Sequence, residues 1–248
     1  MIQLKLEMAG IPFEANCLFE STAKLLRDYQ TDSEAQFSVT MTREELAQEL
    51  IYAREAAELE HRPSDRFTDE QLEYTAMHRL ISEELLERNV LLFHGSALAM
   101  DGEVYLFTAP SGTGKSTHAR YWRRAFGDRV SMVNDDKPFL RFLPDGRVLA
   151  CGSPWRGKHG LGQNIMLPLR AVCLLGRGET NRAERISADD AFTALFRQCF
   201  HSPQPQREIR VLSMLNQLGK NVRLYRLWCN MSIEAAQTAY AALQGGTI

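Results

Sequence analysis

The sequence predicts an α/β protein in which a core built around a phosphate-binding loop (P-loop) follows a small N-terminal α+β segment. Three observations lead to this fold class. A glycine-rich loop stands directly between a strand-like apolar run and a helix-like run. Further short apolar runs, typical of buried strands, alternate with helical runs after residue 90. The preceding part has two helix signals and only short apolar runs. We therefore expect an N-terminal region over residues 1–66 and the P-loop domain over residues 67–248.

The N-terminal region is predicted to combine a few strands and turns, in the first 40 residues, with two capped helices. Capping-box spacing occurs twice, at Thr42-Arg43-Glu44-Glu45 and at Thr68-Asp69-Glu70-Gln71. In a capping box, a hydroxyl and a side chain three residues later bind the free N–H groups at the start of a helix. Helices are therefore expected to run to about Glu60 and to Asn89, with a break at Pro63 between them.

Composition and charge are those of an ordinary globular protein. The 248 residues are 44% hydrophobic and 24% charged, which is enough apolar material for a sizeable core. The net charge of −2 gives no electrostatic reason to expect a nucleic acid or an anionic membrane as partner. The cysteines are scattered and form no CxxC pair, so we expect reduced, mostly buried thiols in a cytoplasmic protein. We expect neither a signal peptide nor a transmembrane span, since no apolar run is long enough.

One strand–loop–helix–strand unit is predicted within the core. Residues 104–107 form an apolar run after the turn signal Asp101-Gly102, and residues 117–126 are predicted as a helix that Gly127 ends. Residues 129–133 are predicted as the next strand. Further strands are expected near residues 90–93, 171–175 and 222–227, and further helices over 187–200, over 208–218 and after Ser232.

The phosphate-binding loop is predicted at Ala109-Pro110-Ser111-Gly112-Thr113-Gly114-Lys115-Ser116. It matches the pattern G-x-x-x-x-G-K-[ST] except that Ala109 stands in the first position. Glycines allow the backbone N–H groups to turn inward around phosphate oxygens, and the following helix directs its positive end at them. The predicted nucleotide contacts are Ser111, Gly112, Thr113, Gly114, Lys115, Ser116 and Thr117, with the Ser116 hydroxyl offered to magnesium. The plainer interpretation is a chance glycine-rich turn before a helix.

Asp135 and Asp136 end the strand that follows the loop helix. In a parallel sheet they emerge at the same edge as the loop, where ligands bind. One carboxylate can take a proton from an acceptor while the other holds magnesium. The alternative is that Asp135-Asp136-Lys137-Pro138 is only a turn.

Basic residues near this edge are interpreted in two ways. Arg156, Lys158 and His159 lie in the glycine-rich segment 152–162, which is expected to be an exposed loop whose cations close over the γ-phosphate. Arg123 and Arg124, on the helix after the loop, are interpreted as a solvated face, and Arg177 as a residue that can reach the nucleotide.

His94-Gly95, the Ser111–Ser116 loop and Asn134-Asp135-Asp136, in this order and spacing, resemble the HPr kinase/phosphorylase family. That family shares its nucleotide site with ATP-dependent phosphoenolpyruvate carboxykinase, and the resemblance covers residues 93–175. It implies an HPr kinase/PEP carboxykinase-like core that uses ATP and magnesium and can form homo-oligomers. It also implies that Asp135 is the general base, that His94 supports Asp135, and that Asp136 helps to hold magnesium.

Three departures narrow what the resemblance implies. Ala109 replaces a glycine, and segment 153–160 does not match the Glu-Ile-Arg-Gly segment that supplies a metal ligand in HPr kinases. The N-terminal residues do not resemble the longer regulatory domain of those enzymes, so phosphorylase activity is not expected. The chain looks more like the short HPr-kinase-like proteins, some of which phosphorylate serine on peptides or on small molecules.

The leading hypothesis is an ATP- and Mg-dependent kinase that uses Asp135, His94, Lys115 and Arg156 to transfer the γ-phosphoryl group to a hydroxyl, with serine favoured. The acceptor is a protein, a peptide or the free amino acid. One alternative is an ATP-binding regulator or scaffold with slow hydrolysis. Another is a carboxykinase-type phosphotransferase, against which the short chain length argues.

Overall fold

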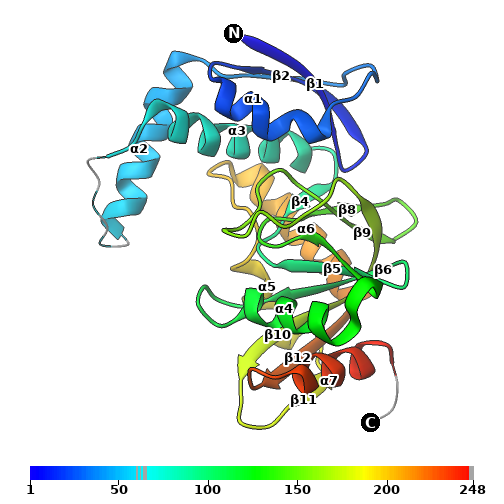
Figure 1. The fold of residues 1–248 in the computed structure, drawn as a ribbon. Helices are drawn as coiled ribbons and strands as arrows, with labels where there is room; N and C mark the ends of the chain where they lie inside the picture. Colours follow the sequence, from blue (N-terminus) through cyan, green and yellow to red (C-terminus); the bar gives the residue numbers. More distant parts are fainter. Residues whose placement is uncertain (60, 62, 64–65, 246–248) are drawn as a thin grey trace. The chain divides into compact units, whose positions relative to one another are not determined.

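The computed structural model describes residues 1–59, 61, 63 and 66–245. Within them, the larger part of the chain is built on a nine-stranded sheet (Figure 1). At its centre β12 (Arg223–Cys229), β10 (Met166–Arg177) and β6 (Glu103–Thr108) are parallel neighbours. On the far side of β6, β5 (Ser96–Met100) pairs antiparallel with both β6 and β7 (Val130–Asn134). Because β5 is antiparallel to each, β6 and β7 run in the same direction and end at the same edge.

This arrangement confirms the predicted strand–loop–helix–strand unit and adds a strand that the sequence did not predict. β5 lies between the two predicted strands, where a simple βαβ unit would place them side by side. Its five residues are all buried and include Ala97 and Ala99, so it lacks the bulky apolar run by which the other core strands were found. The remaining strands of this sheet are β4 (Val90–Leu92), β8 (Phe139–Phe142), β9 (Val148–Cys151) and β11 (Arg182–Arg185).

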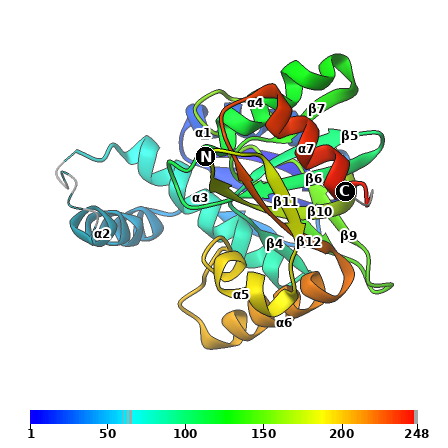
Figure 2. The same ribbon diagram turned by 90° about the horizontal axis from the view of Figure 1, so that it is seen from below.

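Helices cover both faces of the central sheet (Figure 2). α4 (Lys115–Phe126) and α7 (Ile233–Leu243) pack on one face, and α5 (Ala188–Phe196) and α6 (Pro205–Asn221) on the other. Side chains alternate between the two cores along β6: Val104 and Leu106 join the α5–α6 side, while Tyr105 and Phe107 join the α4–α7 side. A strand buried on both faces has a continuous apolar sequence, which is why the apolar run of residues 104–107 predicted a strand.

The N-terminal unit joins a three-stranded sheet to helices. β1 (Ile2–Met8), β2 (Ile11–Cys17) and β3 (Ser38–Thr40) form the sheet. α1 (Glu20–Leu26) was not predicted, whereas α2 (Arg43–Leu59) and α3 (Asp69–Leu86) were. The Gln71 N–H binds the Thr68 hydroxyl at 3.2 Å and the Thr68 N–H binds the Gln71 side chain at 3.1 Å, which is a complete capping box. Glu60, where the first helix was expected to end, lies outside the described residues.

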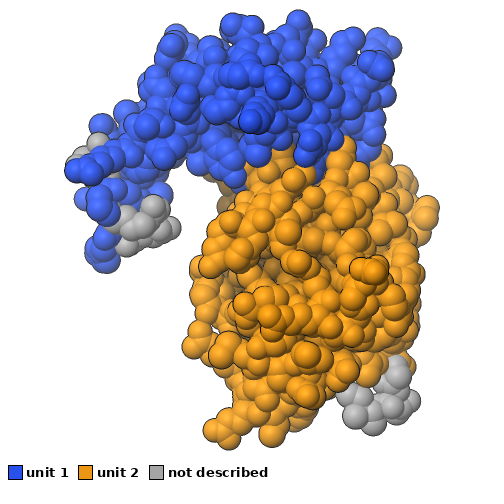
Figure 3. Space-filling view, in the orientation of Figure 1, with its two compact units in different colours: residues 1–85 blue, residues 86–248 orange. Residues whose placement is uncertain are grey.

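The boundary between the two compact units differs from the predicted one (Figure 3). The units are Met1–Leu85 and Leu86–Ile248, so α3 belongs to the N-terminal unit and not to the domain beginning at residue 67. Contacts within the unit explain this. Arg79 of α3 forms ion pairs with Glu45, at 2.8 Å, and Glu49, at 3.1 Å. The fully buried Glu73 accepts a hydrogen bond from the Phe19 backbone N–H at 3.0 Å. Buried charges need such partners, which fixes α3 against α1 and α2.

The prediction that the cysteines are mostly buried is confirmed. All five cysteines are free, and four are buried. Burial raises the pKa of the Cys151 and Cys173 thiols, which keeps them protonated and unreactive. In the part of the chain that the structure describes, no helix combines the length and apolarity required to cross a bilayer.

A buried histidine on α4 makes stability depend on pH. His118 is 4% exposed, its Nε2 accepts a hydrogen bond from the Trp122 indole N–H at 3.0 Å, and burial lowers its pKa from 6.5 to about 4. In the unfolded chain the same imidazole takes a proton near its ordinary pKa. The stabilisation by neutral His118 is therefore complete above that value and is lost as the pH falls toward about 4.

We expect this histidine to account for about 2 kcal/mol of the loss in unfolding free energy between about pH 7 and about pH 5. His118→Gln keeps a hydrogen-bond acceptor for Trp122 but does not titrate, so its stability should fall less over the same interval. Urea unfolding followed by tryptophan fluorescence measures the difference. Parallel pH profiles for the two proteins would show that His118 is not the group responsible.

Candidate functional site

The glycine-rich loop between β6 and α4 depends on two glycines. Gly112 and Gly114 have φ of 76° and 124°, in the region that side chains with a Cβ rarely adopt. Ala109 is not among the residues with positive φ, and it packs into the α4–α7 core at 4% exposure. The first position of this loop therefore does not require a glycine, and a methyl group fills space in the core. The departure from the usual pattern has a structural reason.

Two cations bind carbonyl groups of this loop. The Lys115 Nζ donates to the Ala109 carbonyl at 2.7 Å, and an Arg177 guanidinium N–H donates to the Gly112 carbonyl at 2.7 Å. Burial lowers the pKa of Lys115, while the nearby Asp136 carboxylate acts to raise it. Lys115 has three N–H donors, and its bond to the Ala109 carbonyl uses one of them, which leaves capacity for anionic oxygens. Arg177 lies at the end of β10 and reaches the loop, whereas its predicted contact with the nucleotide stays a prediction.

Asn134 holds the backbone around the two aspartates in a fixed conformation. Its side-chain oxygen accepts hydrogen bonds from the N–H groups of Asp136, at 2.8 Å, and Lys137, at 2.6 Å. Its amide N–H groups donate to the Ser153 carbonyl at 3.0 Å and to the Ser153 hydroxyl at 3.1 Å. Asn134 is fully buried, so these bonds satisfy polar atoms that have no access to water. Sequence reasoning included Asn134 only in the resemblance and gave it no role.

The Asp135 carboxylate is bound by the glycine-rich segment that follows β9. One oxygen accepts the Gly157 N–H at 2.6 Å and the other accepts the Leu161 N–H at 3.4 Å. The Asp135 N–H in turn donates to the Leu161 carbonyl at 3.1 Å. Asp135 is 7% exposed, yet it lines cavities that open beside the loop. The carboxylate is therefore both oriented by the backbone and accessible to a ligand.

The expected pairing of His94 with Asp135 is wrong, because His94 contacts Asp136. The His94 Nε2 lies 3.3 Å from the Asp136 carboxylate. The Asp135 carboxylate is instead bound by the N–H groups of Gly157 and Leu161. Burial acts to raise the pKa of Asp136, but His94, Lys137 and Lys115 outweigh it and the pKa lies below its ordinary value. Asp136 is thus held as an anion.

The backbone at Gly95 leaves no room for a side chain, which explains why a glycine follows His94. A Cβ at Gly95 would lie 2.9 Å from the Phe107 carbonyl of β6. The Gly95 N–H also donates to the Asp136 carbonyl at 2.9 Å. The close approach of the backbone brings His94 to the edge where β6 and β7 end.

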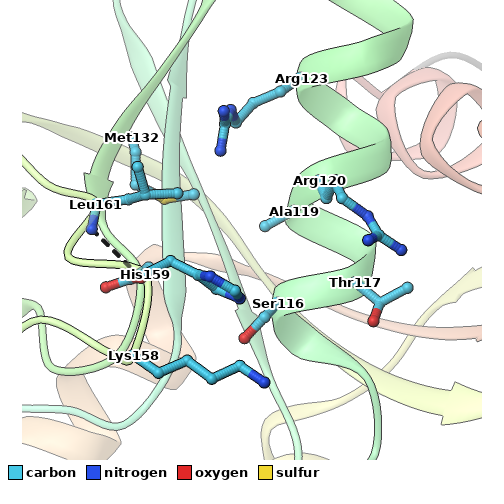
Figure 4. Close-up of a pocket in the computed structure, with 10 residues that line it drawn as sticks. Ser116, Thr117, Ala119, Arg120, Arg123, Met132, Lys158, His159 and Leu161 are labelled. Carbon is cyan, nitrogen blue, oxygen red and sulfur yellow. Dashed lines mark hydrogen bonds between the residues drawn. The ribbon is translucent and has the colours of Figure 1, made fainter.

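Three hollows meet at this edge. A cavity of about 300 Å³, here called the phosphate cavity, is lined by loop residues together with both aspartates, and the full set is His94, Ser111, Gly112, Gly114, Lys115, Ser116, Thr117, Asp135, Asp136 and Lys158. A second cavity of about 510 Å³, the α4 cavity, shares Ser116, Thr117, Asp135 and Lys158 with it (Figure 4). A third of about 500 Å³, the β10 cavity, shares Gly112, Gly114 and Thr117.

The phosphate cavity brings together all the predicted site residues except Thr113 and Arg156. Thr113 lines the β10 cavity instead. Arg156 lines none of the three cavities. Its side chain lies beside Gly162, where an added Cβ would be 3.2 Å from the Arg156 Nε. Lys158 is exposed, extends toward Ser116 (Figure 4) and lines the phosphate cavity, which Arg156 does not.

The glycine-rich segment is also less exposed than predicted. Residues 152–155 are buried, and Trp155 packs edge-on against Phe139 with ring centroids 6.2 Å apart. A Cβ on Gly152 would overlap the Gln163 carbonyl oxygen. Only Lys158, His159 and Gly160 are exposed, so buried residues anchor the start of the segment from which Gly157 and Leu161 bind Asp135.

Oxygen donors suited to magnesium face the phosphate cavity. The Ser116 hydroxyl and the Asp136 carboxylate both line it. Magnesium is usually bound by one or two carboxylates together with phosphate oxygens and water, and this pair fits such a site. Among the described residues, no group of three or more His, Cys, Asp or Glu side chains gathers as a metal site.

Comparisons with known proteins leave the family open. No family model matches the sequence. No curated protein matches it either. Among solved structures, the HPr(Ser) kinase/phosphatase from Coxiella burnetii is similar over 62% of this chain and 93% of that protein, with 13% identity and a TM-score of 0.35. A similarity at that level does not establish a family, so the chemistry has to be inferred from the residues of this chain.

Replacing Asn134 tests whether it supports the site. Asn134→Leu leaves the N–H groups of Asp136 and Lys137 without their acceptor, and each unsatisfied buried donor costs about 1–3 kcal/mol. We expect the unfolding free energy to fall by roughly 2–5 kcal/mol in urea titrations. Gln163→Ala, at an exposed side chain of the same region, should change it by less than about 0.5 kcal/mol. Equal effects of the two substitutions would contradict the proposed role.

Proposed function

We propose that this chain is a P-loop kinase that uses ATP and magnesium to phosphorylate a hydroxyl group, with serine as the favoured acceptor. One observation carries the proposal: loop residues suited to bind phosphate and two aspartates with different environments line the same cavity of about 300 Å³. A nucleotide-binding module needs the loop alone, whereas a carboxylate beside the outermost phosphate is what a transfer to a hydroxyl requires.

The nucleotide's phosphates would be bound by the loop and by Lys115. The backbone N–H groups around Gly112 and Gly114 and the positive end of α4 supply a site for anions. Lys115 is already oriented along the loop by its bond to the Ala109 carbonyl. Ser116 and Asp136 would hold a magnesium ion, which neutralises charge on the terminal phosphates when bound. His94 keeps Asp136 anionic and in place for this task.

Asp135 is our candidate for the general base. Its carboxylate is fixed by the N–H groups of Gly157 and Leu161, and it lines both the phosphate cavity and the α4 cavity. A hydroxyl entering through the α4 cavity would meet this carboxylate next to the terminal phosphate. Lys158 lines both cavities too, and its ammonium group can stabilise the charge that develops on the transferring phosphoryl group.

The β10 cavity is suited to the nucleoside. Tyr121, Leu175, Cys229 and Met231 give it an apolar and aromatic lining, and it joins the phosphate cavity at Gly112 and Gly114. Such a lining is typical of sites for flat ligands. The two other functions weighed above, a regulator with slow hydrolysis and a carboxykinase-type transferase, gain no specific support from this geometry.

Lys115→Ala should weaken nucleotide binding. It removes a buried cation that the loop directs toward phosphate, and a hydrogen bond to a charged group is worth about 1.5–3 kcal/mol. We expect the dissociation constant of Mg-ATP in calorimetry to rise by roughly tenfold to a hundredfold. Lys220→Ala, at an exposed lysine of α6, is the matched control and should bind as the parent does. Unchanged affinity in Lys115→Ala would argue against the phosphate site.

Asp135→Asn should separate binding from chemistry. Asparagine keeps an acceptor for the Gly157 N–H but cannot take a proton, and a general base contributes roughly a hundredfold to ten-thousandfold to the rate. We expect phosphoryl transfer from labelled ATP to serine or a serine peptide to fall by that factor, with Mg-ATP affinity nearly unchanged. Asp128→Asn, at an exposed position, is the control. Normal turnover by Asp135→Asn would reject Asp135 as the base.

The direct test of the proposed function is consumption of labelled ATP in the presence of free serine, a serine peptide or a purified carrier protein. A labelled phosphoserine product supports a kinase. ATP hydrolysis that no hydroxyl acceptor stimulates would instead support the regulatory alternative.

A further inference from the structure

The α4 cavity has a charge pattern that the proposed phosphoryl transfer does not explain. Lys158 and Asp135 belong to the proposed chemistry, but Arg120, Arg123 and His159 also line this cavity. Asp135 is the one carboxylate among its lining residues, and both of its oxygens are bound by backbone N–H groups. The charged side chains on the acceptor side of the base are therefore predominantly cationic.

Arg123 is the cation best placed to bind a ligand. Its side chain projects from α4 into the space opposite Met132 and Leu161 (Figure 4). No ion pair joins Arg123 or Arg120 to a carboxylate within the described residues, whereas Arg129 binds Asp101 at 2.8 Å. Arg120 lies over the Tyr121 ring at 5.7 Å, which leaves Arg123 as the main unpaired guanidinium in the cavity.

An apolar strip lies between this guanidinium and Ser116 (Figure 4). It is formed by Ala119, Met132 and Leu161, which line the cavity. Seven residues of helix, at about 1.5 Å each, place the Ser116 and Arg123 backbones about 10 Å apart. Arginine side chains of a helix lean toward its N-terminus, so the Arg123 guanidinium is directed toward the Ser116 end of the cavity (Figure 4). About two or three residues of extended polypeptide span a distance of this size.

We propose that the acceptor is an acidic peptide segment, in which a carboxylate two or three residues from the phosphorylated serine binds Arg123. This inference rests on the proposed kinase function. The serine hydroxyl meets Asp135, the intervening residues cross the apolar strip, and the carboxylate forms the paired contacts that a guanidinium favours. The carboxylate belongs either to an Asp or Glu side chain or to a peptide's C-terminus.

The test compares acetylated, amidated peptides that carry Glu, Gln or Lys two or three residues before or after a single serine. A further peptide is made without the C-terminal amide. Its free C-terminal carboxylate then takes the place of the Glu side chain. Labelled ATP measures kcat/KM for each peptide and for free serine, and fluorescence anisotropy measures peptide binding without turnover. We expect the Glu peptide, or the free-acid peptide, to exceed the Gln peptide by roughly tenfold or more in both measurements.

Variants at two positions on α4 assign the effect. Arg123→Glu should abolish the preference for the acidic peptide and favour the Lys peptide, with Mg-ATP affinity unchanged. Arg124→Glu makes the same charge change one residue further on, at an exposed position that does not line this cavity, and should keep the acidic preference. This pair separates a local contact from a change in net charge.

The outcomes distinguish the two proposals. Equal binding and turnover of the Glu, Gln and Lys peptides would overturn the anion site even if serine is phosphorylated, and so would a preference for free serine over every peptide. Selective binding of acidic peptides through Arg123 without any phosphoryl transfer would uphold the site and overturn the kinase.

Discussion

The position of β5 between β6 and β7 determines the geometry of the candidate site. Because β5 is antiparallel to both, β6 delivers the glycine-rich loop and β7 delivers the aspartates to the same edge of the sheet. The Gly95 backbone, which enters β5, binds the Asp136 carbonyl and lies too close to Phe107 to carry a side chain. Both faces of this sheet are buried under helices, so packing fixes the positions of the strands. The strand positions in turn determine where the loop and the aspartates lie along the edge.

Buried polar groups convert that edge into a site with defined orientations. Asn134 binds the backbone on both sides of the turn, and the 157–161 segment binds the carboxylate of Asp135. Each of these polar atoms would be costly to bury alone, and together they satisfy one another. The two aspartates consequently have different environments: Asp135 is held by neutral N–H groups, and Asp136 by His94 and nearby lysines.

Sequence reasoning found the elements that local patterns determine and missed the contacts that folding creates. The strands with bulky apolar runs, the capped helices and the glycine-rich loop were predicted because each depends on neighbouring residues. Asn134 and Arg123 were given no function, since their importance comes from residues distant in the sequence. The same limitation explains the wrong partner for His94 and the choice of Arg156 over Lys158. Spacing indicated which residues approach the edge but not which way their side chains point.

Charge is distributed unevenly over the three cavities, with a mostly apolar lining at β10, a cationic loop with two carboxylates in the middle, and cations along α4. In the proposed function, these three surfaces would bind the nucleoside, its phosphates and the acceptor. The most direct measurement is a crystal structure with magnesium and a non-hydrolysable ATP analogue. The account predicts terminal phosphates at the backbone N–H groups of residues 112–116, with the Asp135 carboxylate one hydrogen bond or one water from the γ-phosphate. Phosphates bound elsewhere, or Asp135 directed away from them, would contradict it.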